Sequence, residues 1–138
     1  MEYLRCYAPV SLQAIGHNIG EVRKRLAPGV KLMAVIKADA YGHGACRVGK
    51  YLESQVDYFA VATLEEALEL RESGITRPIL ILSYISPSQY PELVEHNITQ
   101  TIDSPEQADA LEAAAARAGV RAKIHIAVDT GMTRNGFQ

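Results

Sequence analysis

The sequence predicts an α/β fold with a parallel sheet, and three features of the chain support this prediction. Short apolar runs recur along the chain, stretches with helical periodicity separate them, and hydroxyl caps and glycines mark where the helices begin and end. Buried strands that alternate regularly with helices form parallel sheets with right-handed crossovers. Two architectures satisfy this pattern, a doubly wound sheet and part of a (β/α)8 barrel, and periodicity alone does not separate them.

Five apolar runs are the candidate strands. Each run is short and is bounded by residues that favour turns, as expected for a strand rather than a helix. The first run is broken only by Lys31 and has the composition of a strand covered on both faces. In chain order the runs are residues 30–36, 58–62, 79–82, a weaker run at 98–102, and 122–128.

The segments between these runs carry signals for helix starts and ends. A serine or threonine at the start can accept a hydrogen bond from a free amide, and in three cases a Glu or Gln three residues later can reach back. A glycine at the end provides the left-handed conformation of a C-cap. The predicted starts are Ser11, Thr63, Ser86 and Ser104, and the predicted ends are Gly74 and Gly119.

The composition is that of a globular domain of 138 residues, with 48% hydrophobic and 22% charged residues. A formal net charge of -2 gives no electrostatic reason to expect nucleic acid or an anionic membrane as a partner, so a small molecule is favoured. Because no apolar stretch has the length of a signal peptide or a membrane span, we expect a cytoplasmic protein. Cys6 and Cys46 lie far apart without a histidine cluster, which predicts reduced thiols and no metal site.

Residues 33–44, Met-Ala-Val-Ile-Lys-Ala-Asp-Ala-Tyr-Gly-His-Gly, are chemically the most informative. Lys37 follows four apolar residues and is therefore predicted at the carboxyl end of a buried strand, where parallel α/β folds place their ligands. Burial disfavours a charge and makes the neutral amine, which attacks aldehydes, more accessible. The alternative interpretation is a lysine that extends from the strand end with its ammonium group in water.

The turn after Lys37 carries groups suited to a phosphate. Tyr41 supplies a phenol, and Gly42 and Gly44 supply a backbone that can approach a phosphate, ahead of a helix with free amides. A phosphate-bearing aldehyde would fit such a site. A Gly-x-Gly turn before a helix is common, however, and it lacks the spacing of a P-loop or a dinucleotide fingerprint.

Residues 34–44 closely resemble the pyridoxal 5'-phosphate (PLP) attachment signature of alanine racemases. Three other segments are similar to the same family: residues 11–18 to its opening helix, 59–67 to its second barrel strand and helix start, and 128–137 to its Asp-Thr-Gly-Met loop with an arginine. The resemblance covers nearly the whole chain. It implies the barrel rather than the doubly wound sheet, because the family has an N-terminal (β/α)8 barrel followed by a β-rich C-terminal domain.

The resemblance implies a role for four matched residues. Lys37 would hold PLP as a Schiff base and also serve as one of two acid/base groups. Tyr41 would contact the cofactor phosphate. Arg134 would lie beside the phenolic oxygen of PLP and help to bind substrate, a role that suits a planar, permanently charged donor, and Met132 would contact substrate.

Three further positions in the matched segments have other expected roles. Asp129 would order its loop through local hydrogen bonds, and His43 would pack in the turn after the lysine. Many family members carry a carbamylated lysine where this chain has Ala127, which cannot be carbamylated. If that carbamate orients the arginine, Arg134 needs another anion in this chain.

The implied reaction is the reversible racemisation of L- and D-alanine, which supplies D-alanine for peptidoglycan. In the family the enzyme is a homodimer whose partner subunit provides the opposite base, a tyrosine of the C-terminal domain. A complete barrel takes about 250 residues, so residues 1–138 correspond to the N-terminal portion of the PLP-binding barrel domain. We therefore expect the remaining half-barrel and the β domain to be absent, and the isolated chain to be a weak or inactive racemase that self-associates through open sheet edges.

Three alternatives remain open from the sequence. The first is a serine racemase of the same family, because most of the substrate pocket would lie outside this chain. The second is a non-catalytic PLP-binding fragment that keeps Lys37 but turns nothing over. The third is an ordinary βα domain without a cofactor, which requires the match at residues 34–44 to be accidental.

Overall fold

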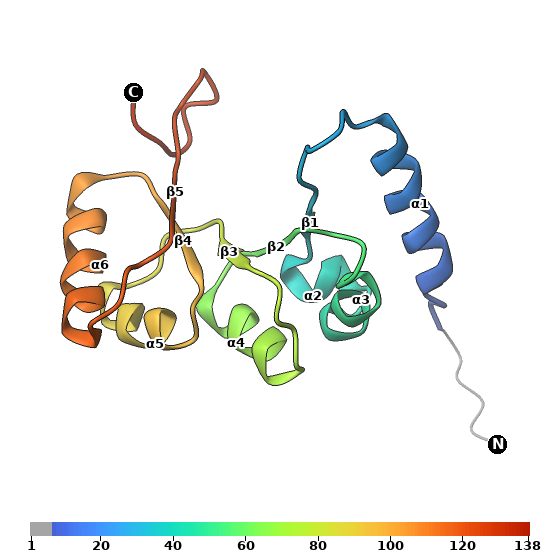
Figure 1. The fold of residues 1–138 in the computed structure, drawn as a ribbon, viewed down its shortest axis with the longest axis horizontal. Coiled ribbons are helices and arrows are strands. Elements are labelled where there is room, and N and C mark those ends of the chain that lie inside the picture. Colours follow the sequence, from blue (N-terminus) through green and yellow to red (C-terminus); the bar gives the residue numbers. More distant parts are fainter. Residues whose placement is uncertain (1–6) are drawn as a thin grey trace.

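The computed structural model describes residues 7–138 as a layer of parallel strands with helices on one face (Figure 1). The strands are β1 Met33–Val35, β2 Tyr58–Val61, β3 Ile79–Ile81, β4 Thr99–Ile102 and β5 Ile124–Ile126. They pair in chain order, and each neighbouring pair is parallel. Every predicted apolar run therefore contains a strand, although each strand is shorter than its run.

The described residues form six α-helices, of which three begin directly after a predicted cap, Ser11, Thr63 or Ser104. The helices are α1 Leu12–Arg25, α2 Lys37–Gly42, α3 Ala45–Leu52, α4 Leu64–Glu72, α5 Tyr90–Glu95 and α6 Pro105–Ala118. The Oγ of Ser11 accepts a hydrogen bond from the amide of Ala14 at 3.2 Å, and Thr63 forms a complete capping box with Glu66. Gly119 ends α6 in the left-handed conformation, with φ of 69°.

The segment after Ser86 differs from the prediction of a single helix start. It opens with a 3-10 turn, Pro87–Gln89, and the α-helix begins only at Tyr90. Pro91 has no N–H, so it cannot donate to the carbonyl of Pro87 as a continuous α-helix would require. The amide of Tyr90 donates to that carbonyl instead, which produces the tighter turn.

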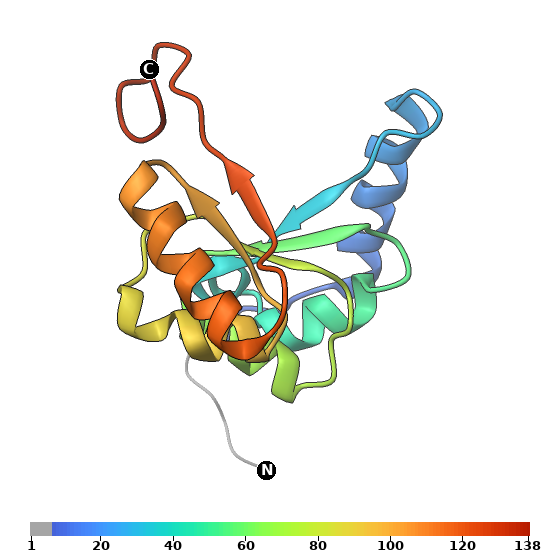
Figure 2. The same ribbon diagram turned by 60° about the vertical axis from the view of Figure 1, so that its left-hand side comes forward.

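The sheet is curved, and this decides between the two predicted architectures. The rings of Tyr58 in β2 and His125 in β5 have centroids 5.8 Å apart. In a flat sheet, strands three positions apart would be separated by about 14 Å. The sheet also keeps sequential strand order, and helices α2 to α6 lie on one side of it (Figures 1 and 2). A doubly wound sheet reverses its order and carries helices on both faces, so this is part of a (β/α)8 barrel.

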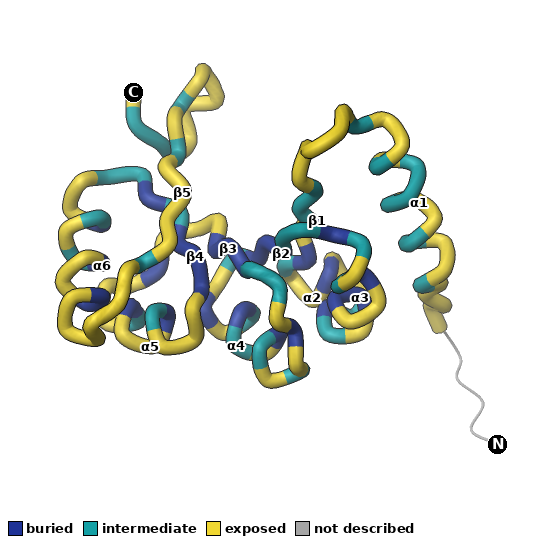
Figure 3. Tube along the Cα trace, viewed as in Figure 1, coloured by how far each residue is buried: buried dark blue, intermediate teal, exposed yellow. Residues whose placement is uncertain are grey.

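The hydrophobic core lies between the convex face of the sheet and the helices, where β2 and β3 are almost completely buried (Figure 3). Alternate strand residues point toward the helices and meet apolar side chains from α3, α4, α5 and α6. The largest side chains of this core that are fully buried include Phe59, Ile79, Ile81, Ile102, Leu52, Leu64, Leu70, Leu93 and Leu111.

The prediction that the first strand is covered on both faces is wrong for the described residues. Ala34 and Ile36 are buried against the helices, whereas Val35 points to the concave face and is 42% exposed. β1 and β5 are the two edges of the described sheet, and all three residues of β5 are exposed.

Two further sequence expectations concern the cysteines and membrane spans. Cys46 is a half-buried free thiol, and Cys6 lies outside the described residues. Within residues 7–138, none of the helices combines the length and the apolar character that crossing a membrane requires.

Candidate functional site

Lys37 lies at the carboxyl end of β1, as predicted. It is the first residue of α2 and is half-buried. The residue before it, Ile36, is buried, and its amide donates to the carbonyl of Ala60 at 2.9 Å, which anchors the end of β1 to β2. Within residues 7–138 the ammonium of Lys37 forms no hydrogen bond or ion pair, so no carboxylate neutralises its charge.

The residues after Lys37 form a left-handed turn rather than an ordinary helix. Ala38, Asp39, Ala40 and Tyr41 have φ between 50° and 53° and ψ between 40° and 50°. For L-residues this conformation costs roughly 1–2 kcal/mol per residue, and it normally occurs at single positions. Four consecutive instances are therefore a concentration of backbone strain, of the kind that clusters at functional sites.

Hydrogen bonds from both sides maintain this turn. The amide of Ala40 donates to Ile36 at 2.9 Å, and the amide of Gly44 donates to the carbonyl of Asp39 at 2.9 Å. The carboxylate of Asp39 also accepts from the amide of Ala45, the first residue of α3, at 2.6 Å. Nδ1 of His43 lies 2.9 Å from the carbonyl of Ala40, an arrangement that agrees with the turn-packing role expected for this histidine.

Tyr41 closes the left-handed turn and is 61% exposed. Its side chain lines an open apolar groove of about 440 Å³ between α1 and β1, together with Ile19, Val35 and His43. The phenol is thus available to a ligand that approaches the end of β1. Lys37 precedes this strained turn and Tyr41 ends it.

The helix after the turn offers a phosphate fewer free amides than expected. The first amide of α3, on Ala45, is already bound by the carboxylate of Asp39. A negative charge therefore occupies the position where a phosphate would gain most from the helix N-terminus.

Met132 and Arg134 lie in the loop that follows β5, at the same carboxyl edge of the sheet as Lys37. Both are exposed, Met132 by 74%. No hydrogen bond or ion pair within residues 7–138 joins them to Lys37 or Tyr41, and none gives Arg134 an anionic partner. The structure therefore places the four predicted site residues on one edge in two separate groups, one after β1 and one after β5.

Asp129 orders this loop, as expected. Its Oδ1 accepts hydrogen bonds from the amides of Gly131 and Thr133, each at 2.9 Å. Gly136 closes the loop with φ of 121°, and a Cβ there would lie 2.7 Å from the amide nitrogen of Asp129. Only glycine fits at this position, because the clash would be with backbone rather than with a mobile side chain.

We predict that this loop loosens in acid. The hydrogen bond from Thr133, followed by that from Gly131, lowers the pKa of Asp129 from its usual 3.8. The stabilisation is fully present above the usual pKa and is lost as the pH falls through the lower folded value. NMR shifts of the Gly131 and Thr133 amides should move together below about pH 4. In Asp129→Asn the movement should disappear, and its persistence would rule out this carboxylate as the cause.

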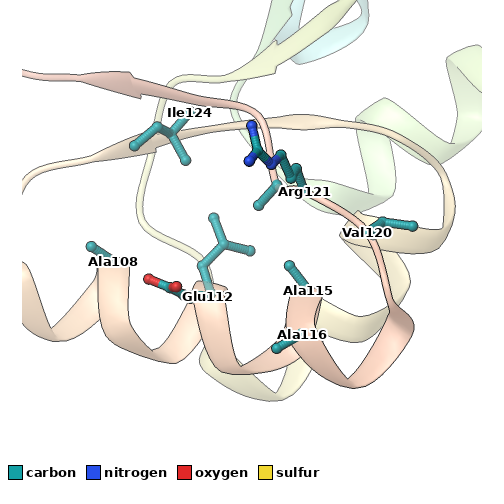
Figure 4. A pocket seen from close by; sticks show the side chains of 9 residues that line it. Ala108, Glu112, Ala115, Ala116, Val120, Arg121 and Ile124 are labelled. Atoms are coloured by element: carbon teal, nitrogen blue, oxygen red, sulfur yellow. The ribbon is translucent and has the colours of Figure 1, made fainter.

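A second groove, of about 310 Å³, lies on the convex side between α6 and β5 (Figure 4). Alanine side chains from α6 and Ile124 from β5 line most of it, with Glu112 and Arg121 as its charged groups. It has no nucleophile and lies on the helix side of the sheet rather than at the carboxyl edges. We therefore do not assign the site to this groove.

Comparison with known proteins agrees with this geometry. Residues 10–138 match the sequence profile of the family described as "Alanine racemase, N-terminal domain". The chain belongs to the alanine racemase family. Two curated alanine racemases illustrate the similarity: alanine racemase 1 of Caldanaerobacter subterraneus subsp. tengcongensis is 53% identical over 129 residues, and that of Desulforamulus reducens is 47% identical over 132.

Solved structures of alanine racemases have the same fold. That of Clostridium difficile 630 superposes on 92% of this chain with a TM-score of 0.85 and 44% sequence identity. That of E. faecalis covers 93% of this chain with a TM-score of 0.83 and 38% identity. The chain spans about a third of the length of these relatives: 33% of the Caldanaerobacter protein and 33% of the C. difficile chain.

Sequence reasoning missed two side chains that shape the turn after Lys37. Asp39 was not expected to bind the amide of Ala45, because it lies six residues before that amide and the N-cap position of α3 is Gly44. Glu66 was predicted only as part of the capping box of α4, yet its Oε1 also accepts from the amide of Ala38 at 2.7 Å. No sequence pattern signals this second bond, because its partners are 28 residues apart.

Proposed function

We propose that this chain carries the cofactor-attachment portion of a PLP-dependent alanine racemase, with Lys37 as the attachment residue. The observation that carries the proposal is the strained left-handed turn that begins directly after Lys37. Strain of this kind persists only where the surrounding structure maintains it, and here three side chains and several backbone bonds do so. Such an arrangement suits a lysine that must be held in one orientation.

The groups at this edge fit PLP in their chemistry. An amine without a carboxylate partner can attack an aldehyde, and an exposed phenol can donate to a phosphate. When bound, PLP supplies a conjugated pyridine system that stabilises the negative charge left on Cα after its proton is removed. The protein supplies attachment, orientation and proton transfer.

In this proposal, each predicted site residue keeps a distinct task. Nζ of Lys37 holds the cofactor and moves a proton on one face of the substrate. The hydroxyl of Tyr41 binds the phosphate. Arg134, which has no anionic partner in the described chain, is available to the ring oxygen and the substrate carboxylate, and Met132 contacts the substrate. Inversion at Cα requires a second group on the opposite face, because Lys37 reaches only one face.

The substrate, assembly and compartment belong to the same proposal. The relatives named above are alanine racemases, which favours alanine over serine as the substrate. The product D-alanine would serve peptidoglycan synthesis. A cytoplasmic homodimer, in which the partner subunit provides the second proton-transfer group, is carried over from the family resemblance.

The experiment follows PLP attachment in the purified chain. After incubation with PLP, wild type should develop the blue-violet absorbance of lysine-bound PLP, and borohydride should fix the cofactor on the peptide that contains Lys37. Lys37→Ala should lose both signals completely, because within residues 7–138 no other lysine follows a strand at this edge. Lys31→Ala is the matched control, since Lys31 is an exposed lysine just before β1, and this variant should behave as wild type.

Either of two results would count against the proposal. One is a Lys37→Ala variant with the same band and the same reduced adduct as wild type. The other is a wild-type adduct that maps to several surface lysines in proportion to their exposure.

A further inference from the structure

Glu66 lies on the first turn of α4 and is half-buried. Its two carboxylate oxygens contact different parts of the fold. Oε2 accepts from the amide of Ala62 at 2.7 Å and from that of Thr63 at 3.4 Å, which completes the helix cap. Oε1 accepts from the amide of Ala38 at 2.7 Å. One side chain therefore ties the start of α4 to the residue directly after Lys37.

The cap of α4 uses only one of the two carboxylate oxygens of Glu66. A capping box requires the N3 side chain to reach the backbone at its own helix start, and Oε2 alone satisfies that requirement. The bond from Ala38 to Oε1 contributes nothing to the cap. It instead brings a charged acceptor to the first residue of the left-handed turn, where φ of Ala38 is 50°.

The turn is held at its other end by different groups. Asp39 binds the start of α3 through Ala45, and His43 lies against the carbonyl of Ala40. These bonds fix the middle and the exit of the turn. The entry, which sets the direction in which Lys37 leaves β1, is held by the backbone bond from Ala40 to Ile36 and by Glu66.

We propose that Glu66 is a positioning residue for Lys37, acting through the amide of Ala38. The inference rests on the proposed function, in which Lys37 must present its amine to the cofactor in one orientation. Without the carboxylate, the amide of Ala38 loses its partner, and the peptide between Lys37 and Ala38 is restrained only through the backbone bond from Ala40 to Ile36. Lys37 would then still react with an aldehyde but would no longer hold it at a fixed angle.

The test compares Glu66→Ala with Thr63→Ala in the full chain. Thr63→Ala removes the hydroxyl that accepts from the Glu66 amide at 3.3 Å, and it weakens the cap while leaving the bond to Ala38 in place. Glu65→Gln removes a charge from the neighbouring residue, whose side chain contacts Gln89 instead. Glu66→Gln keeps a single acceptor oxygen and serves as the conservative variant.

Two readouts are recorded for each variant. The first needs no cofactor: hydrogen exchange at the amide of Ala38 should become at least about tenfold faster in Glu66→Ala, the equivalent of one lost hydrogen bond. Thr63→Ala and Glu65→Gln should exchange as wild type at this amide. The second readout is the visible circular dichroism of PLP bound at Lys37, which reports a fixed orientation. It should collapse in Glu66→Ala, recover in part in Glu66→Gln, and persist in both controls.

The outcomes separate this inference from the proposed function. A wild-type chain that never develops the PLP band counts against the proposed function, and the exchange of Ala38 then decides the inference by itself. Exchange at Ala38 that is equally slow in wild type and Glu66→Ala overturns the inference, as does unchanged circular dichroism in Glu66→Ala. A collapse of the signal in Thr63→Ala as well as in Glu66→Ala would also overturn it, because the cap alone would then explain the effect.

Discussion

Replacing Phe59 with alanine is expected to lower the free energy of unfolding by about 3–5 kcal/mol. Phe59 is in β2, near the middle of the sheet, and none of its surface is exposed. Its strand neighbours in register are Ala34 and Ile79, so the small side chain of Ala34 cannot fill the space left by a lost ring. The variant loses the transfer free energy of the ring and retains a cavity against the helices.

Urea unfolding followed by far-ultraviolet circular dichroism measures this loss, as a lower midpoint at similar slope. Tyr84→Ala is the aromatic control, because Tyr84 is 60% exposed and its removal should change stability by no more than about 0.5 kcal/mol. Equal effects of the two substitutions would mean that Phe59 is not packed as the structure describes.

Asp39→Val is expected to destabilise the fold by about 2–3 kcal/mol and to disrupt the turn that presents Lys37. Two effects combine. The variant loses the carboxylate that accepts from the amide of Ala45 at 2.6 Å, and it forces a β-branched residue to adopt φ of 53°. The second effect is specific to this turn, because valine is well tolerated in strands and acceptable in right-handed helices.

Asp39→Asn separates the two effects. Asparagine keeps an acceptor oxygen and tolerates the left-handed conformation, so it should lose less than about 1 kcal/mol. Thermal unfolding of both variants, together with the yield of PLP adduct at Lys37, provides the comparison. If valine and asparagine were equally stable, the left-handed geometry of the turn would be wrong.

Local signals in the sequence predicted most of the elements. The Ser11 and Thr63 caps and the Gly119 C-cap form as expected, because each depends on a side chain and backbone groups within a few residues. The position of Lys37 at a strand end was predictable for the same reason, since a continuous apolar run ends immediately before it. The 3-10 turn after Ser86 was not predicted, although the spacing of Pro87 and Pro91 was a usable signal.

Local sequence patterns could not predict the features that depend on contacts between residues far apart in the chain. From the sequence, only the family resemblance favoured a barrel over a doubly wound sheet. The structure adds a physical reason, because the contact between Tyr58 and His125 shows that the sheet is curved. The exposure of Val35 depends on what packs opposite the concave face, which an apolar run does not reveal. The sequence around Val35 does not differ from that of a strand that is covered on both faces.

The sequence by itself determined the existence of the five strands and the starts of α1, α4 and α6, and it placed Lys37 and Tyr41 in the segment after β1, because caps, turns and hydrophobic periodicity act over a few residues. Only the tertiary structure decided that residues 38–41 adopt a left-handed turn and that Glu66 holds its entry. The physical reason is that this strained backbone is stabilised by partners as far as 28 residues away, which come within hydrogen-bonding distance only after β1, β2 and α4 have packed together.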